Sequence, residues 1–502
     1  MRESRAIGPS ARRLWSWAIF ISVAGVGARA LWYLKFRDDL DVRLGPDALI
    51  FLAQAESFVR DGITGASQAT LGAAPEATPP GYPLLITGIW NLLPAGDVYA
   101  GREYVLLIVR GVQWLLAGAT TLMTFALARR VLFGFSALVP PLLLTISIAM
   151  IDTPNLFMNE TLLAFLLTAA VLSLVQAREA DAPPSPDPPA QGAKPKRRLG
   201  AGLPVMIAGL AVSCAVLTQP RIAIALPFMA IWLLTAVPRR YCAIFVLVSL
   251  LLPAAWVVRD YAIYDEIVPV SVGWQVALYE DNVRPVGGSG TRPLISPECV
   301  DLDPAGVGGP ANAFEFADCM QRQGLGELTA HPGRSARAIP DRLAALVSPW
   351  NPDHARGEYR ADMRHWRSMI PVATRADSSF VAADRVVNVV WIALYVLFLA
   401  LGLWSLWPEG PGSPARLIAI PILTLPLAHL LFHAEGRFRL PMLPLLAIAL
   451  TLGILAALEI LRGDRVGEPL TEPFAGPPED PPAGLLPEQL GFDDAAEPPS
   501  YG

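Results

Sequence analysis

Four aspartates gather near the start of the chain, just after its first apolar run: Asp38, Asp39, Asp41 and Asp47. Asp47 opens the stretch DALIFLAQAESFVRDG, which predicts a helix that begins at an aspartate and ends at Gly62. At about 100° per residue, Asp47, Gln54 and Asp61 share one face of this helix. Phenylalanines flank that face, so we expect the helix to lie in the interface of a membrane.

A carboxylate held at the apolar edge of a bilayer is partly desolvated. Desolvation raises the pKa of the carboxylate and makes it a better general base at neutral pH. Asp47 is therefore a candidate catalytic base. The alternative is that Asp47 only caps the N-terminus of its helix, and one residue can do both.

The motif PPGYP follows this helix and marks a second candidate segment, the substrate loop Pro79, Pro80, Gly81 and Tyr82. The three prolines, with Pro83 as the third, are expected to exclude a helix and to force an extended turn. Gly81 permits tight backbone geometry. The following apolar run, 84–93, is too short to span a bilayer, so we expect it to lie in the interface or to re-enter. The alternative is a stiff loop without function.

Further ionisable residues stand at the expected outer ends of apolar runs: Asp152, Glu160, Arg221, Arg259, Asp260, Glu435, Arg437 and Arg439. Charges at such positions are costly unless they face a cavity, a partner or the lipid headgroups. The guanidinium group pairs with phosphate oxygens at two points, so these arginines are candidates for binding a lipid phosphate. The alternative for each arginine is contact with lipid headgroups. The motif HAEGRFRLP is less easily explained in that way, because it puts three charged residues in one short turn.

Other chemistries lack support in the sequence. The five histidines show no metal-ligand spacing, so no metal site is expected. Nucleotide-binding and nucleophile-elbow motifs are absent as well. We therefore expect no cofactor.

The composition indicates the kind of fold that holds these candidate residues in place. The 502 residues are 53% hydrophobic and only 17% charged, which is too apolar for an ordinary soluble domain. Apolar runs recur along the chain and predict about ten transmembrane helices: 14–34, 104–127, 135–151, 160–176, 203–217, 222–237, 241–258, 386–407, 417–432 and 441–461. The first run is too long for a signal peptide and lacks a cleavage site, so it is expected to remain as a helix. The fold class is an all-α polytopic membrane protein, and a net charge of −5 gives no footprint for nucleic acid.

Lys and Arg in short loops predict the orientation. If all ten runs cross, the basic clusters at the N-terminus, 129–130, 194–198, 239–240 and 462–465 fall on one side, which is then cytoplasmic. Both termini are cytoplasmic in this arrangement, and the candidate site is extracytoplasmic. The predicted organisation is an N-terminal membrane domain (1–258) with a first outer loop (35–103), a mixed outer segment (259–385), C-terminal membrane helices (386–461) and a disordered tail (462–502).

Two of the four cysteines, Cys299 and Cys319, lie in the second outer segment. An oxidising compartment permits a disulfide between them, with a structural role, and the alternative is two free thiols.

The order of these motifs resembles the bacterial integral-membrane GT-C glycosyltransferases of the family 39 type, related to protein O-mannosyltransferases and the lipid A aminoarabinose transferase. The resemblance covers roughly residues 14–461. It is carried by GPDALIFLAQAESFVRDG, PPGYP, VRGVQWLLAGATTLMTFALARRVLFG, MNETLLAFLL, TQPRIAIALP, LLPAAWVVRD, SVGWQVALYEDN and HAEGRFRLPMLP.

The resemblance implies a GT-C fold in the inner membrane of a bacterium. It also implies inverting transfer of a hexose or pentose from a polyprenyl-phosphate donor to an acceptor hydroxyl of a lipid, glycan or protein. Asp47 stands where the family has its base. Glu160 fits the family's second acid, with Asp152 as the alternative. Arg259 and Arg437 match basic residues that contact the lipid phosphate in relatives.

One position departs from the family pattern. Some relatives carry Lys directly before the proline pair, where this chain has Thr78. Its absence shifts the expected phosphate contacts to Arg221, Arg259, Arg437 and Arg439. Two other functions stay open at this point: a transporter or lipid flippase, and a GT-C homologue without activity that serves in assembly. A transporter favours charges near the bilayer midplane, whereas here the charges gather at one surface.

Overall fold

The computed structural model describes residues 10–42, 46–64, 78–93, 102–181, 200–283, 298–299, 310–347, 378–407, 410–430 and 436–462. Every regular element in these ranges is a helix, as the apolar runs predict. The predicted tail 462–502 falls outside them except for its first residue.

Five described helices are long and apolar enough to cross a membrane: α1 (Ala11–Val42), α4 (Arg102–Ala128), α7 (Glu160–Asp181), α10 (Arg239–Tyr264) and α17 (Leu443–Arg462). A bent pair supplies a sixth candidate, and four apolar segments are shorter: α8 (Gly202–Thr218), η3 (Pro220–Ile224) with α9 (Ala225–Ala236), part of α15 (Ser378–Leu406), and α16 (Pro414–Thr424) with η6 (Leu425–Leu430). These ten segments coincide with the ten predicted runs. The protein is thus a helical membrane protein, and the count of ten crossings stays a prediction.

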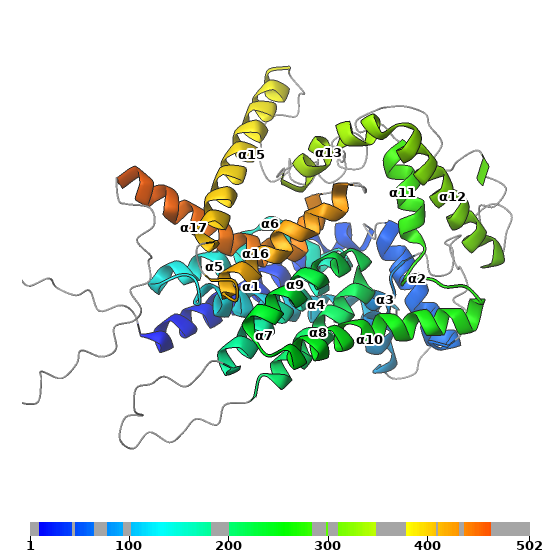
Figure 1. The fold of residues 1–502 in the computed structure, drawn as a ribbon, viewed down its shortest axis with the longest axis horizontal. Helices are drawn as coiled ribbons and strands as arrows, with labels where there is room; N and C mark the ends of the chain where they lie inside the picture. Colours follow the sequence, from blue (N-terminus) through cyan, green and yellow to red (C-terminus); the bar gives the residue numbers. More distant parts are fainter. Residues whose placement is uncertain are drawn as a thin grey trace, which may run out of the picture.

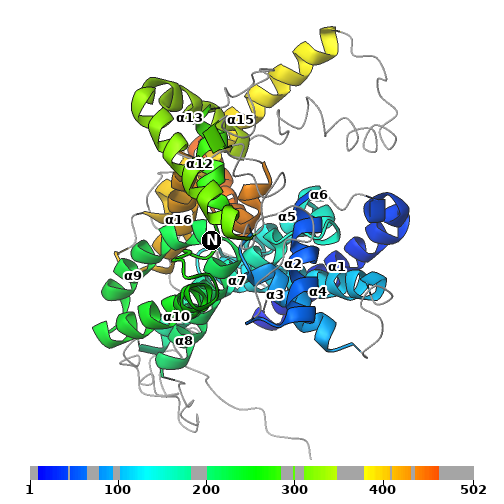
Figure 2. The same ribbon diagram turned by 90° about the vertical axis from the view of Figure 1, so that its right-hand side faces the viewer.

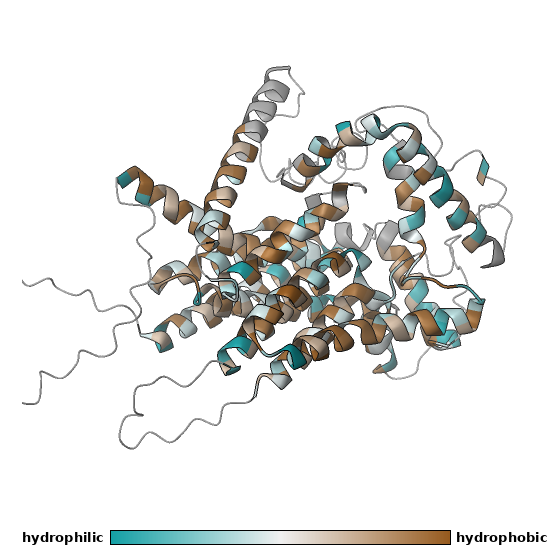
Figure 3. Cartoon of the chain, viewed as in Figure 1, coloured by the Kyte–Doolittle hydropathy of each residue, from teal (hydrophilic) through white to brown (hydrophobic). Residues whose placement is uncertain are grey.

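The bundle is built around α7, the most buried of the five long helices. It packs against α4 on one side and α8 on the other, and α10 lies against α8. Figure 2 shows α7 between these two groups of helices. Brown, hydrophobic residues predominate along these helices in Figure 3, as expected for helices that contact both a core and lipid tails.

The predicted run 135–151 is not one straight helix. Helix α5 (Val139–Ile146) ends at Ser147, whose ψ of 118° is extended, and α6 (Ile148–Asp152) continues at an angle of 62°. Side chains of helix α1 form hydrogen bonds to the segment after this break. Arg29 Nε donates to the carbonyl oxygen of Met150 at 2.9 Å, and Trp32 Nε1 donates to Asp152 Oδ1 at 2.9 Å. Backbone groups freed by a broken helix need such partners inside a membrane protein.

The first outer loop contains two helices, α2 (Pro46–Asp61) and α3 (Gly81–Asn91), which pack against each other. Helix α2 matches the prediction and is followed by Gly62 at a φ of 77°. The predicted extended turn at Pro83 is wrong, since Pro83 lies in the first turn of α3. Proline is tolerated there because the first amides of a helix have no intrahelical partner. Helix α1 continues to Val42, so the first residues of the predicted loop 35–103 are helical.

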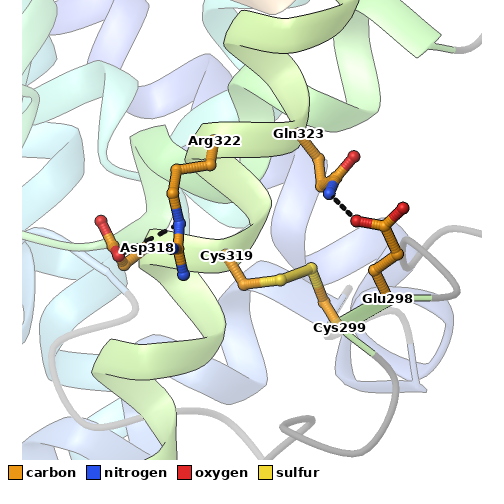
Figure 4. Close-up of a disulfide and its surroundings, with 6 residues drawn as sticks. All are labelled: Glu298, Cys299, Asp318, Cys319, Arg322 and Gln323. Carbon is orange, nitrogen blue, oxygen red and sulfur yellow. Dashed lines mark hydrogen bonds and ion pairs between the residues drawn. A yellow bond between two sulfur atoms is a disulfide. The ribbon is translucent and has the colours of Figure 1, made fainter.

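The described part of the second outer segment is helical: α11 (Gly273–Val283), α12 (Pro310–Ala330) and α13 (Pro332–Val347). A disulfide joins Cys299 to Cys319 of α12, next to the buried Tyr279 of α11 (Figure 4). Helices α11 and α12 approach closely at Gly324, where a Cβ would lie 2.9 Å from the Tyr279 nitrogen.

Figure 1 places α2, α3, α11 and α12 at the same end of the bundle, the right-hand end of the view, while α17 ends on the left. Helices α15 and α17 cross at two glycines, Gly402 and Gly453. A Cβ on either one would lie 2.7 Å from a carbonyl carbon of the other helix. Such small-residue crossings are common between membrane helices.

Candidate functional site

The candidate base lies at the start of α2. Helix α2 begins at Pro46, so the backbone of Asp47 belongs to the first helical turn rather than to the residue before it. The Asp47 side chain lies outside the described atoms. The far end of the same face is described: Asp61 is exposed, and a hydrogen bond from Arg60 lowers the pKa of its carboxyl group.

Gln54 connects α2 to the residue before the proline pair. The Thr78 hydroxyl donates to Gln54 Oε1 at 2.5 Å, and the Gln54 side chain is 8% exposed. The position at which some relatives carry Lys is thus occupied here by a neutral hydroxyl bound to α2.

The glycine of the PPGYP motif marks a close approach to α8. A Cβ on Gly81 would lie 2.6 Å from the backbone nitrogen of Thr218, the last residue of that helix. The carbonyl oxygen of Thr218 accepts a hydrogen bond from Asn159 Nδ2 at 3.2 Å. Gly81 therefore lets the start of α3 approach the end of α8 closely.

Tyr82 lies in the protein interior and contributes no exposed surface. Its hydroxyl accepts a hydrogen bond from Gln113 Nε2 of α4, and Gln113 also donates to the Met158 carbonyl oxygen at 3.0 Å. Burial raises the pKa of Tyr82 well above its usual value, and the nearby Glu160 carboxylate raises it further. Tyr82 thus ties α3 to α4 and α7 instead of facing solvent.

Glu160 is the first residue of α7 and is 4% exposed. The Glu160 carboxylate and the Arg110 guanidinium each interact electrostatically with Tyr82. The predicted second acid is therefore buried beside the PPGYP helix. The alternative, Asp152, is half-buried and accepts its hydrogen bond from Trp32.

Arg110 is a site residue that the sequence analysis missed. It is 1% exposed, donates to the Asn155 carbonyl oxygen at 3.2 Å and lies over the Tyr33 ring at 4.9 Å. Trp114, one turn further along α4, donates to Asn155 Oδ1 at 2.9 Å. An arginine within the apolar run LLIVRGVQWLL is itself a signal, because charges inside membrane helices usually face a polar interior.

Arg259 lies near the C-terminal end of α10. Its Nε donates to the Ile63 carbonyl oxygen just after α2 at 2.8 Å, and its Nη1 pairs with Asp260 at 2.5 Å. The guanidinium carbon is 4.5 Å from the Trp256 ring and 5.9 Å from the Phe58 ring. The structure thus joins Arg259 to the acidic helix α2.

Another group of arginines lies in and around η7 (Gly436–Met442). This short helix packs against α7. Arg221 of η3 lies 4.7 Å from the Phe438 ring, and Arg439 donates to the Leu346 carbonyl oxygen of α13 at 3.3 Å. The backbone of Arg437 belongs to η7, and its side chain lies outside the described atoms. Arg342 of α13, which the sequence analysis missed, is 3% exposed and donates to the Leu430 carbonyl oxygen at 2.8 Å.

The described residues contain no group of three or more His, Cys, Asp or Glu that could hold a metal ion. The site that they form has carboxylates on α2 and α7 and arginines on α10 and η7. Such a group of residues can bind an anionic group.

No family model matches the chain, and no curated protein matches it. Several solved structures are similar to this chain. The archaeal oligosaccharyltransferase AglB from Archaeoglobus fulgidus, in complex with an inhibitory peptide and a dolichol-phosphate, has 13% sequence identity and a TM-score of 0.44. The match covers 90% of this chain and 52% of AglB, so the chain spans about half the length of that protein. The apo oligosaccharyltransferase of the same organism has 14% identity, a TM-score of 0.49 and the same coverage.

The third similar structure is ArnT from Cupriavidus metallidurans bound to undecaprenyl phosphate, with 15% identity and a TM-score of 0.33. The match covers 86% of this chain and 80% of ArnT. AglB and ArnT are GT-C membrane glycosyltransferases, the class that the sequence resembles. At these identities and TM-scores, the likeness alone decides neither activity nor substrate.

Proposed function

We propose that this protein is an inverting membrane glycosyltransferase, which moves a sugar from a polyprenyl-phosphate donor to an acceptor hydroxyl on the extracytoplasmic side. One observation carries the proposal. The acidic helix α2, the PPGYP helix α3, the buried Glu160 and the arginine of α10 meet at one end of an apolar bundle. This end offers a carboxylate for the acceptor and cationic groups for a phosphate next to the lipid that carries it.

Asp47 is the proposed base. It accepts the proton of the acceptor hydroxyl while the hydroxyl oxygen attacks the anomeric carbon from the face opposite the phosphate. The bond between that carbon and the phosphate oxygen breaks, and the electron pair leaves with the phosphate. A single displacement of this kind inverts the anomeric configuration. The phosphate monoester leaves without protonation, so the site needs one base and stabilisation of the leaving charge.

Arg259 is the proposed main phosphate contact, with Arg221, Arg437 and Arg439 as further candidates. The aromatic rings of Phe58 and Trp256 surround its guanidinium and lower the local dielectric constant. Electrostatic stabilisation of a leaving group is stronger in such surroundings than in water. Glu160 is the proposed second carboxylate, and its burial suits a role in orienting groups at the site.

The test uses purified protein in nanodiscs with a panel of polyprenyl-phosphate sugars, and water or the hydroxyl groups of the nanodisc lipids serve as acceptors. Wild type is compared with Asp47→Asn and, as a matched control on the same helix face, with Asp61→Asn. We expect wild type and Asp61→Asn to release polyprenyl phosphate at similar rates. Asp47→Asn should be slower by about 100-fold or more, the usual effect of losing a general base. Equal rates in all three would exclude Asp47 as the base, and no release from any donor would contradict the proposed activity.

A further inference from the structure

Two buried side chains on α2 and α10 each have a hydrogen-bond donor without an acceptor among the described residues. Gln54 of α2 is 8% exposed and Trp256 of α10 is 6% exposed. Thr78 occupies Gln54 Oε1, but Gln54 Nε2 has no partner among the described residues. Trp256 Nε1 also has none within that part of the chain. A donor that has lost water without gaining an acceptor costs stability, so each of the two is a polar group in need of a ligand.

The two donors belong to one neighbourhood. Phe58 lies one turn after Gln54 on α2, and its ring centroid is 5.9 Å from that of Trp256. Arg259 lies one turn after Trp256 on α10 and contacts both rings. Gln54 thus lies on the face of α2 whose Phe58 meets the indole of Trp256 and the guanidinium of Arg259.

The chemistry of the amide, indole and guanidinium groups indicates which kind of ligand they can bind. An indole N–H only donates, and a guanidinium only donates, so the ligand must supply several acceptor oxygens. The hydroxyl of Thr78 can donate or accept, so one end of the Gln54 amide lacks a partner whichever way the amide is turned. In the orientation that the structure has, this end is the N–H₂ group. An anion with several oxygens, such as a phosphate monoester, satisfies all three donors.

Neutral donors matter more here than in a strongly cationic site. Asp260 is fully buried and pairs with Arg259, which offsets part of the guanidinium charge. Thr78, the residue before the proline pair, is also neutral. Hydrogen bonds from uncharged groups must therefore supply a larger share of anion recognition.

We propose that Gln54 and Trp256 are phosphate-binding residues, which donate N–H groups alongside Arg259 to the phosphate of the donor lipid, a phosphate that becomes a monoester when the sugar leaves. The inference rests on the proposed function and deepens it by naming two binding residues to which the sequence motifs assign no role. Both residues act on binding, so their effect is expected on affinity.

The test measures equilibrium binding to the purified full-length protein in detergent by native mass spectrometry. The probes are farnesyl phosphate, farnesol and inorganic phosphate. We expect wild type to bind farnesyl phosphate more tightly than farnesol. Trp256→Phe and Gln54→Met should each weaken binding of farnesyl phosphate by about 10-fold and leave binding of farnesol unchanged, as loss of a hydrogen bond to an anion predicts.

Trp232 provides a matched control. It is 3% exposed, but its Nε1 donates to the Ser413 carbonyl oxygen at 2.9 Å. Trp232→Phe should lower the melting temperature and leave the affinity for farnesyl phosphate unchanged. Trp256→Phe should show the opposite pattern, with a ligand-free melting temperature equal to or above that of wild type, because it removes an unsatisfied polar group.

The outcomes separate this inference from the proposed function. If wild type binds farnesol as tightly as farnesyl phosphate, the proposed phosphate-linked donor is wrong. If wild type prefers the phosphate and both variants keep that preference, only the roles of Gln54 and Trp256 are wrong. Competition by inorganic phosphate that both variants weaken would support the two residues, with free phosphate as the ligand source.

Discussion

At the scale of single residues, the buried pair of Tyr82 and Gln113 links the PPGYP motif to the bundle. The Tyr82 hydroxyl accepts from Gln113, so Tyr82→Phe removes one buried hydrogen bond. We expect the free energy of unfolding to fall by about 1 kcal/mol. Because the pKa of Tyr82 is raised in the folded state, its contribution is complete below the ordinary tyrosine pKa of about 10 and is lost as the pH rises further.

The direction of this pH dependence can be measured. Thermal unfolding of wild type and Tyr82→Phe in detergent is followed between pH 8 and pH 11, where the wild type should lose stability more steeply above about pH 10. Parallel curves at alkaline pH would show that Tyr82 already ionises freely, in contrast to its buried position.

Residue types and their places along the chain predicted part of the candidate site. Glu160 and Arg259 could be proposed because they stand at the ends of apolar runs, where charges are costly without a role. Gln54 and Trp256 could not be proposed in this way. An amide on an amphipathic helix and a tryptophan near a helix end are ordinary in sequence. Only the three-dimensional contacts show that their N–H groups lack acceptors.

At the scale of elements, hydrophobic periodicity predicted the helices better than their ends. Each apolar run became a helix or a bent pair, because helix formation satisfies the backbone inside a membrane. The errors concerned a helix start and a break within a helix. Proline at the first turn of α3 begins a helix rather than ending one, and the break at Ser147 depends on partners in α1 that local sequence does not reveal.

Two glycines of α3 provide a matched pair for testing how closely this element must approach the bundle. A Cβ on Gly81 would meet the backbone of Thr218, whereas Gly88 is exposed and has no atom within 4 Å of such a Cβ. Gly81→Ala should therefore displace α3 and lower both transferase activity and the melting temperature. Gly88→Ala should leave activity unchanged and stabilise the helix by about 0.5–1 kcal/mol. Equal effects of the two substitutions would argue against a tight contact between α3 and α8.

At the scale of the whole molecule, α10 has a basic end and, opposite to it, an end at the candidate site. The exposed Arg239 begins α10, on the side that the arginine pattern predicts to be cytoplasmic. The helix has 26 residues and ends beside α2 and the candidate site. At 1.5 Å per residue the helix is about 39 Å long, which exceeds the roughly 30 Å of a bilayer core. One helix thus connects the predicted cytoplasmic face to the proposed catalytic face.

This arrangement predicts the sidedness of single cysteines. In a background in which the free Cys214 and Cys242 are replaced by Ala, we consider Arg239→Cys, Glu266→Cys and Asp61→Cys, all at exposed positions. A membrane-impermeant maleimide applied to cells whose outer barrier has been opened should label Glu266→Cys and Asp61→Cys. It should label Arg239→Cys only after the inner membrane is permeabilised. Labelling of all three from one side would mean that α10 does not cross. Reversed labelling would put the proposed phosphate site in the cytoplasm, where transfer to an extracytoplasmic acceptor is impossible.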